Sequence, residues 1–283
     1  MKIRFFLVLF LLNSTHSFCQ TKLSGQVFDS LTMKPIPYVH ILFDIGGGLV
    51  TDENGFFKIN ETKTIKELKF SVLAYEEKVI KHRATKNLQI FLKTKTYQLD
   101  EISVSPEPKD TEIFIKNPNK KRRTNHWFCH ETVGSEWVHY FPSDDTNTPT
   151  YLYSFSLFFK KNKANRKLRI RVYDTNENGS PAQSLLHQSV FFEITKKKGW
   201  KEFILSQYNI KLPKHGFFVG VEFLPIKSNN EKTVCFGLNA KNNNTNTWVK
   251  LTGGEWFKET NLRDNKNRIE NLMIKIKLER IVD

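Results

Sequence analysis

The densest group of metal-binding residue types in the sequence lies between residues 126 and 139. His126, Cys129, His130, Glu131 and His139 all carry atoms that can bind zinc. In an extended strand the side chains of His126 and His130 share one face, whereas Cys129 points to the other. A single zinc site would therefore require the segment to bend. We predict no metal here, and keep His126 and His130 as the residues that a zinc site would use.

A second pattern, in the stretch DTNENG, matches the first half of a calcium loop. Asp174, Asn176 and Asn178 occupy alternate positions before Gly179, as in the loop of an EF-hand. The twelfth position is Leu185, where that loop needs a bidentate glutamate, and strands instead of helices are expected on both sides. We therefore predict a turn rich in Asx residues, with Asp174, Asn176 and Asn178 as the alternative calcium ligands.

Three successive glycines and an acidic turn occur in the stretch VHILFDIGGGLVTDENGFFKI, residues 39–59. A phosphate-binding loop requires a helix after its glycines, but a strand pattern follows here. Placing Gly55 at the sixth position of a calcium loop puts Val50 where the first aspartate should be. We therefore predict that the glycines bend the chain at a strand edge, and that Asn54-Gly55 supplies the positive φ of a tight hairpin.

No pattern for nucleophilic catalysis was found in the sequence. It has no Gly-x-Ser-x-Gly motif, and Cys129 and Cys235, the two cysteines after residue 19, lie in strand-like surroundings. We predict no catalytic residue and no cofactor. The alternative is a hydrolase of unrecognised type that uses the region from His126 to His139.

Tryptophan is the residue type best suited to ligand binding in this chain. Exposed aromatic rings bind the flat faces of sugars, and amide and acidic groups bind their hydroxyls. All five tryptophans lie at residue 127 or later, and Trp256 adjoins a Gly-Gly pair. We predict ligand binding at Trp256, Trp248 and Trp137. The alternative is that these rings pack in the core or at the rim of a sandwich.

The N-terminal residues MKIRFFLVLFLLNSTHSFC have the order of a secretory signal peptide. Lys2 and Arg4 precede the apolar run Phe5–Leu12, and we expect cleavage after Cys19. The alternative is a lipoprotein in which Cys19 is retained and acylated. No later stretch reaches about 18 apolar residues, so we expect no transmembrane segment after residue 19. The predicted location is the periplasm or the outer membrane.

The formal net charge of +15 falls to +13 without residues 1–19, because Lys2 and Arg4 are the only charged residues there. In an exported protein this charge favours anionic lipids, acidic glycans or acidic proteins as partners over nucleic acid. The lysines are spread over most of the chain, which is also typical of a solvated surface. The predicted contact with an anionic surface is the cluster Lys120, Lys121, Arg122 and Arg123.

Alternating apolar residues predict short strands along most of the chain. In LKFSV the residues Leu68 and Phe70 share one face, and LMIKIKL sets Ile274 and Ile276 against two lysines. No segment has a sustained helical repeat, so sandwiches are the natural way to bury these one-sided strands. We predict an all-β protein with a signal peptide at residues 1–19, a sandwich at 20–105, a basic linker at 106–125 and a jelly-roll-like sandwich at 126–283.

The N-terminal part resembles a known domain family in the order of its motifs. It combines LSGQVFD, the proline pair of KPIPYVHI, the turn TDENGFF, the strand LKFSVLAY and the closing LDEISVS. In this order they resemble the carboxypeptidase-regulatory-like domain common in exported proteins of Bacteroidetes. The resemblance implies a seven-stranded, transthyretin-like sandwich of the carbohydrate-binding-like fold without a catalytic residue. The second part, with RIRVYDTNENGSPAQSLL, is similar to C-terminal sandwich regions of unassigned activity.

The sequence thus predicts an exported, non-catalytic binding or adaptor protein of the cell envelope, with a glycan or a protein as its ligand. The alternatives are the hydrolase named above and a purely structural envelope adaptor. Whether Cys129 and Cys235 form a disulfide stays open at this point.

Overall fold

The computed structural model describes most of the chain between residues 23 and 282. The described residues are 23–60, 64–81, 87–96, 110–116, 126–130, 132–143, 148–160, 166–194, 198–226, 234–240 and 245–282. The predicted signal peptide with Cys19, the basic cluster at residues 120–123 and Glu131 lie outside the described residues.

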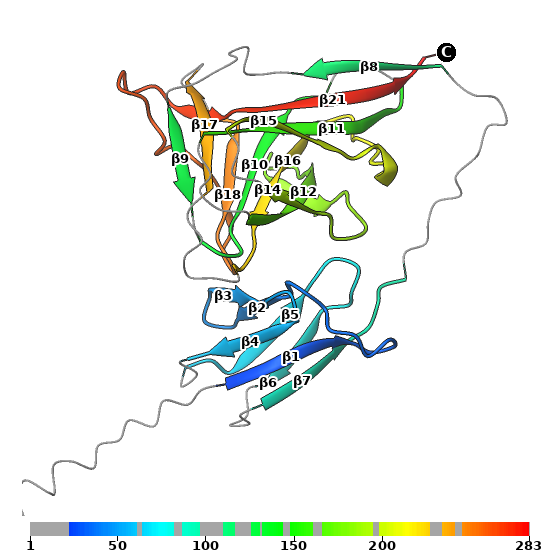
Figure 1. The fold of residues 1–283 in the computed structure, drawn as a ribbon, viewed down its shortest axis with the longest axis vertical. Coiled ribbons are helices and arrows are strands. Elements are labelled where there is room, and N and C mark those ends of the chain that lie inside the picture. The colour runs from blue at the N-terminus through cyan, green and yellow to red at the C-terminus, as the bar shows by residue number, and fades with distance from the viewer. Residues whose placement is uncertain are drawn as a thin grey trace, which may run out of the picture.

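The described residues form two β-sandwiches, one above the other in Figure 1. The strands of the N-terminal sandwich are β1 (Leu23–Asp29), β2 (His40–Phe43), β3 (Gly48–Val50), β4 (Phe56–Ile59), β5 (Glu67–Ser71), β6 (Lys78–Lys81) and β7 (Asn87–Leu92). The prediction of an all-β protein with a seven-stranded first sandwich is confirmed.

Two small sheets make up the N-terminal sandwich, with strand orders β4-β1-β7 and β3-β2-β5-β6. All of their pairs are antiparallel except β1 with β7, which is parallel. The predicted alternation holds on β5, where Leu68 and Phe70 are fully buried while their neighbours are partly exposed. These two side chains pack with Val27 and Ile41 in one core between the sheets.

The C-terminal sandwich consists of many short strands and two longer ones. They are β8 (Thr111–Lys116), β9 (Trp127–His130), β10 (Glu136–Phe141), β11 (Thr150–Phe159), β12 (Arg166–Thr175), β13 (Pro181–Ser184), β14 (Phe191–Ile194), β15 (Gly199–Ile204), β16 (Phe217–Phe223), β17 (Val234–Ala240), β18 (Thr247–Lys250), β19 (Trp256–Lys258), β20 (Glu270–Leu272) and β21 (Ile274–Ile281). A 3-10 turn, Ser206–Tyr208, precedes β16. In the described part of the chain no helix is long and apolar enough to cross a membrane.

These strands form two sheets. The facing sheet has the order β13-β12-β16-β10-β18-β19, with β14 also on β12, and it lies toward the N-terminal sandwich in Figure 1. The distal sheet has the order β20-β17-β11-β21-β8, with β15 also on β11 and β9 on β17. Large apolar side chains, among them Phe155, Phe159, Phe223 and Phe236, fill the core between the two sheets.

Part of the expected linker at residues 106–125 is a strand. Thr111–Lys116 forms β8, which pairs antiparallel with β21 at the edge of the distal sheet. Phe114 packs against the core of the C-terminal sandwich, and the guanidinium of Arg280 lies 4.6 Å from the centre of its ring. The short apolar run Ile113–Ile115 is therefore sufficient to pair with a neighbouring strand.

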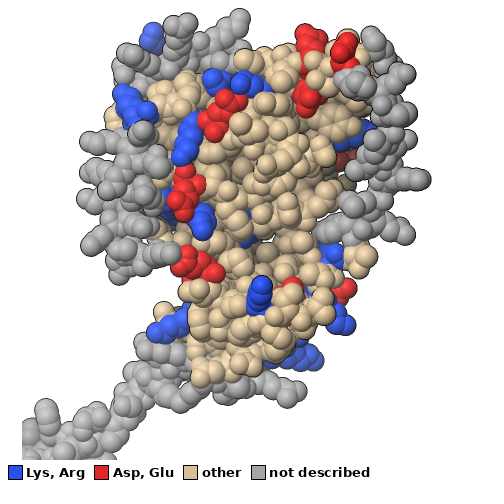
Figure 2. Space-filling model, turned by 45° about the vertical axis from the view of Figure 1, so that its right-hand side comes forward, with Lys and Arg blue, Asp and Glu red and all other residues tan. Residues whose placement is uncertain are grey.

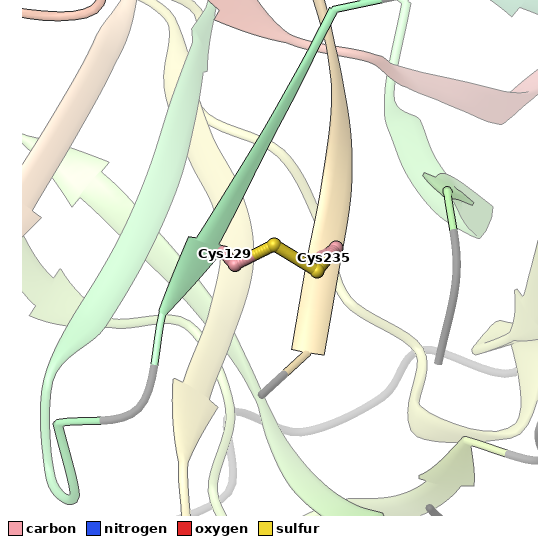
Figure 3. Close-up of a disulfide and its surroundings, with 2 residues drawn as sticks. All are labelled: Cys129 and Cys235. Atoms are coloured by element: carbon pink, nitrogen blue, oxygen red, sulfur yellow. A yellow bond between two sulfur atoms is a disulfide. The ribbon is translucent and has the colours of Figure 1, made fainter. Parts of the chain in front are cut away.

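Cys129 and Cys235 form a disulfide (Figure 3). The two cysteines are directly opposite each other on the antiparallel strands β9 and β17. They are 106 residues apart in the sequence. The bond therefore joins the start of the C-terminal sandwich to one of its late strands and closes a large loop of chain.

His139 lies in the core of the C-terminal sandwich. It alternates on β10 with outward-facing residues, is 2% exposed and packs edge-on against Phe141 at 5.1 Å between ring centres. Neither ring nitrogen has a hydrogen-bond partner among the described residues. Burial lowers the pKa of this imidazole to about 3, so it is neutral in the folded protein over the physiological range.

Removing the disulfide should destabilise the protein. A cross-link that closes a loop of this length restricts the unfolded chain, so the double variant Cys129→Ser, Cys235→Ser should lose about 2 to 5 kcal/mol of unfolding free energy. Denaturant titration with and without a thiol reductant measures this loss. Reductant should lower the wild-type midpoint and leave the variant unchanged. Equal wild-type midpoints in both conditions would contradict the expectation.

His139 should weaken the fold in acid. Its pKa of about 3 in the folded state lies below the ordinary value of 6.5, so between these pH values the unfolded chain binds the extra proton. Stability is therefore lost as pH falls from 6.5, by about 2 to 3 kcal/mol at pH 4.5. The variant His139→Leu should lack this contribution. The exposed His187, changed to Gln, is the control and should keep the wild-type slope in denaturant titrations at pH 7.5 and 4.5.

Candidate functional site

The outward surface of the facing sheet carries polar and aromatic side chains in cross-strand rows. The register of β12, β16, β10 and β18 sets three rows: Arg169, Glu222, Glu136 and Lys250; then Arg171, Gly220, Val138 and Trp248; then Tyr173, Phe218 and Tyr140. The charged row and Arg171 lie toward the N-terminal sandwich, and the aromatic row lies beyond them. The sheet thus presents charge at its junction with the N-terminal sandwich and aromatic rings next to it.

Glu222 is the centre of a buried network of charges. Its side chain is fully buried, and its Oε2 atom lies 2.6 Å from Arg171 Nη2 and 3.3 Å from Arg169 Nη1. Arg171 also reaches Glu136, with 3.3 Å between Nε and Oε2. The hydroxyl of Tyr173 donates to the same oxygen of Glu136. Two arginines and two carboxylates therefore neutralise each other below the surface.

The pKa values of this network follow from its pairing. Burial alone would raise the pKa of Glu222, but Arg169, Arg171 and His40 outweigh it and hold that pKa well below its ordinary value. Burial would also lower the pKa of Arg171, but Glu136 and Glu222 raise it above the ordinary value. Both groups therefore stay ionised across the physiological pH range.

The N-terminal sandwich completes this network. His40 on β2 places its Nε2 atom 2.8 Å from Glu222 Oε1. Arg169 Nη2 donates to the main-chain carbonyl of Tyr38 at 2.5 Å. Tyr38 and Val50 from the N-terminal sandwich pack with Leu224 in a small apolar cluster at the same junction. The two sandwiches are therefore joined by buried charges, a hydrogen bond and apolar contacts.

The glycine stretch lies at this junction as well. A Cβ atom added to Gly253, in the turn between β18 and β19, would lie 2.1 Å from the carbonyl oxygen of Gly47. Both residues have a positive φ, 74° and 77°, which other residues rarely adopt. The glycines after β2 thus let two main chains meet. The predicted positive φ at Gly55 is also confirmed, at 73°.

A cleft of about 450 Å³ opens beside the network, between the two sandwiches. Figure 2 shows the molecule narrowing where the sandwiches meet, with charges of both signs on this face. Most of the lining side chains are polar or charged. The lining residues are His40, Leu42, Lys69, 71–75, Glu77 and Lys95 from the N-terminal part, and Gly134, Glu136, Arg171, Tyr173 and 250–255 from the C-terminal part.

Aromatic rings continue from the cleft along the facing sheet. Tyr173 lines the cleft, and its ring meets that of Trp256 edge-on, with 5.4 Å between ring centres. Trp256 follows directly after the lining residue Glu255. Trp248, on the neighbouring strand, packs edge-on against Phe218 at 5.9 Å. The aromatic surface and the polar cleft therefore adjoin each other at Tyr173 and Trp256.

The structure brings together two of the three tryptophans predicted to bind a ligand. Trp248 and Trp256 lie on the paired strands β18 and β19 and belong to the same aromatic cluster. Trp256 is partly exposed and Trp248 is 9% exposed. Trp137 is placed differently, because it points from β10 into the core, is 2% exposed and packs against Phe128 at 4.6 Å. The prediction for Trp137 is therefore corrected to a core residue.

The candidate zinc ligands whose side chains are described do not meet. Cys129 is in the disulfide, His139 is in the core, and His126 Nδ1 lies 3.2 Å from Glu270 Oε1. His130 is in β9, but its side chain is not among those described. Among the described residues no three potential metal ligands form a group. The region that the alternative hydrolase would use is therefore divided between the core, a disulfide and an ion pair.

The calcium pattern is a turn between β12 and β13. Asn176 Oδ1 accepts a hydrogen bond from the main-chain nitrogen of Ser180 at 2.9 Å, and Asp174 Oδ1 lies 2.8 Å from His215 Nε2. Gly179 has a φ of 72°. The side-chain oxygens of Asp174 and Asn176 therefore bond within the protein, and Asn178 is exposed in the turn.

The residues of the charge network were not among the site residues predicted from the sequence. The run LRIRV shows Arg169 and Arg171 on one face of a strand, which is the usual pattern of a solvent-facing side. The useful signal was the glutamate in FFVGVEF: a lone acid, Glu222, in an otherwise apolar strand that would need a buried partner.

Removing the charge of Glu222 should weaken both the fold and the junction. The variant Glu222→Gln leaves Arg169 and Arg171 buried with one carboxylate fewer, which should cost about 3 to 5 kcal/mol of unfolding free energy. X-ray scattering should show a larger radius of gyration as the sandwiches separate. The control is Glu77→Gln, which breaks an exposed pair with Lys69 and should cost less than about 1 kcal/mol. Equal stability and shape in both variants would refute this account.

The N-terminal sandwich is similar to a known domain family. Residues 23–104 match the family model described as CarboxypepD_reg-like domain. No curated protein matches the chain.

The similar solved structures are distant. The cysteine protease and lectin-like domains of Cwp84, a surface layer associated protein of Clostridium difficile, are 12% identical, with a TM-score of 0.42, over 63% of this chain and 37% of that chain. Clostridial Cwp84 after propeptide cleavage is 12% identical, with a TM-score of 0.43, over 83% of this chain and 52% of that one. The chain thus spans 37% and 52% of these two proteins. The N-terminal sandwich is thus the part of the chain that is similar to a known family, the CarboxypepD_reg-like domain, over residues 23–104.

Proposed function

We propose that the protein is an exported, non-catalytic binding protein that holds a glycan in the cleft between its two sandwiches. One observation carries this proposal: the cleft of about 450 Å³ has polar walls from both sandwiches and adjoins the aromatic pair Tyr173–Trp256. Its volume is in the range of small-molecule sites. The CarboxypepD_reg-like domain supports a binding or regulatory role for the protein as a whole.

The chemistry of the lining suits a ligand rich in hydroxyl groups. Sugars offer apolar ring faces to aromatic side chains and hydroxyls to charged and polar ones. In the cleft, the network fixes Arg171 and Glu136 before any ligand arrives, because each is held by ion pairs or hydrogen bonds. Groups that are already ordered lose little conformational entropy on binding.

On the N-terminal side of the cleft, a hydrogen bond also holds the lining segment in place. The segment 72–75 lines the cleft, and the hydroxyl of Tyr75 donates to Asp29 Oδ2 at 2.9 Å. Burial and Asp29 raise the pKa of Tyr75 to about 12, so the hydroxyl keeps its proton and the bond. The N-terminal sandwich therefore acts as one wall of the proposed site.

The non-catalytic part of the proposal rests on the region from His126 to His139. A nucleophilic thiol is not present at Cys129, because its sulfur is bonded to that of Cys235. His139 is a core residue that stays neutral. These facts favour binding over the hydrolase alternative.

Export is supported by the disulfide and by the signal-like N-terminal sequence. Disulfides persist in oxidising compartments such as the periplasm and the extracellular space. We therefore propose a periplasmic or outer-membrane-associated location. A further contact with an anionic surface through Lys120, Lys121, Arg122 and Arg123 is part of the same proposal.

Trp256 tests the glycan site. The wild type should bind a subset of oligosaccharides on a glycan array, and Trp256→Ala should weaken binding of the best of them about tenfold or more by titration calorimetry, because a large aromatic contact is lost. Phe257→Ala is the matched control, since Phe257 lies on the other face of β19 and is 42% exposed. Its affinity should stay at the wild-type value.

Two outcomes would reject the proposed function. Wild-type protein that binds no oligosaccharide on the array would favour the structural adaptor. Equal affinity of Trp256→Ala and the wild type would place any glycan site elsewhere. In both cases circular dichroism of the variants must match that of the wild type, so that a folding defect is not mistaken for a binding defect.

A further inference from the structure

We infer that the glycan held in the cleft is acidic and carries a carboxylate next to a sugar ring that contacts Trp256. This inference rests on the proposed glycan function and names the class of its ligand. It comes from the charges that remain in the cleft once the internal ion pairs are set aside.

Two cationic side chains of the cleft already have carboxylate partners. Lys69 Nζ lies 2.6 Å from Glu77 Oε2, and Arg171 contacts both Glu136 and Glu222. These pairs cancel most of the charge of the lining. They leave little attraction for a charged ligand at their own positions.

His40 also has a carboxylate partner, Glu222, and the remaining basic residues of the lining are Lys95 and Lys250. Neither is in an ion pair with a residue that the structure describes, and the same is true of one acid in the lining, Glu255. The cleft therefore keeps two ammonium groups against one carboxylate. A single negative charge on a ligand would balance it.

The ammonium group of Lys250 lies over an aromatic ring. Lys250 is directly opposite Trp256 in the pair β18–β19, and its Nζ atom lies 5.7 Å from the centre of the Trp256 ring. Its other cross-strand neighbour, Glu136, is bonded to Arg171 and Tyr173. An ammonium group next to a ring fits a sugar whose ring face meets the indole and whose carboxylate meets the lysine.

The overall charge of the chain agrees with an acidic ligand. The formal net charge, +13 without residues 1–19, attracts anions over distances up to about a Debye length, some 10 Å at 0.1 M salt. A neutral glycan would not use this field. An acidic one would bind faster and more tightly at low ionic strength.

The test compares uronic-acid oligosaccharides with their carboxyl-reduced counterparts, in which a neutral hydroxymethyl group replaces the carboxylate. By calorimetry the wild type should bind the acidic form about tenfold or more tightly than the reduced form, because a hydrogen bond to a charged group is lost on reduction. This preference should shrink as salt is raised. The double variant Lys95→Gln, Lys250→Gln should lose the preference, so that it binds the two forms with equal affinity.

Matched variants separate the possible results. Trp256→Ala should weaken both forms by the same factor, and Lys58→Gln, a change outside the cleft on β4, should alter neither. If the wild type binds both forms equally, or the double variant keeps the acidic preference, the glycan function stands and the acidic class is wrong. If neither form binds and the array is also empty, the glycan function itself fails, and this inference fails with it.

Discussion

The arrangement of the two sandwiches depends on the ion pairs of the Glu222 carboxylate. This carboxylate is fully buried, lies between two arginines and receives His40 from the other sandwich. A lone charge in such a place would be very costly, so each member of the network requires the others. Because its members come from both sandwiches, the same group of atoms stabilises the facing sheet and sets the position of the N-terminal sandwich against it.

This arrangement also explains where a ligand site can exist. The paired charges of the facing sheet, Arg169, Glu222 and Glu136, lie at the junction, whereas the aromatic row continues past it. The cleft lies where the two meet, and it has ordered polar groups on one side and rings on the other. A smaller N-terminal sandwich would leave the arginines exposed to water, and one that covered the sheet completely would leave no cleft.

The sequence was informative about local structure and much less about the junction. Alternation predicted strands such as β5, and motif order predicted the N-terminal sandwich, because both depend on neighbours along the chain. The same alternation suggested solvent around Arg169 and Arg171, since a strand pattern distinguishes two faces but not what covers the polar one. Trp137 and Trp256 were grouped for their chemistry alone. Trp137 points into the core and Trp256 points outward from the same sheet. Which face a strand residue occupies, and which strands are neighbours, cannot be read from one sequence.

The contact between Gly47 and Gly253 has a consequence for how the two sandwiches could be separated on purpose. The two sandwiches fit together here because glycine has no side chain. The main chains meet at a point where a Cβ atom on Gly253 would collide with Gly47. Even the smallest substituent at Gly253 would act as a wedge at the end of the cleft, while the charges of the network stayed chemically intact. Such a wedge offers a way to open the molecule without altering a single ionisable group.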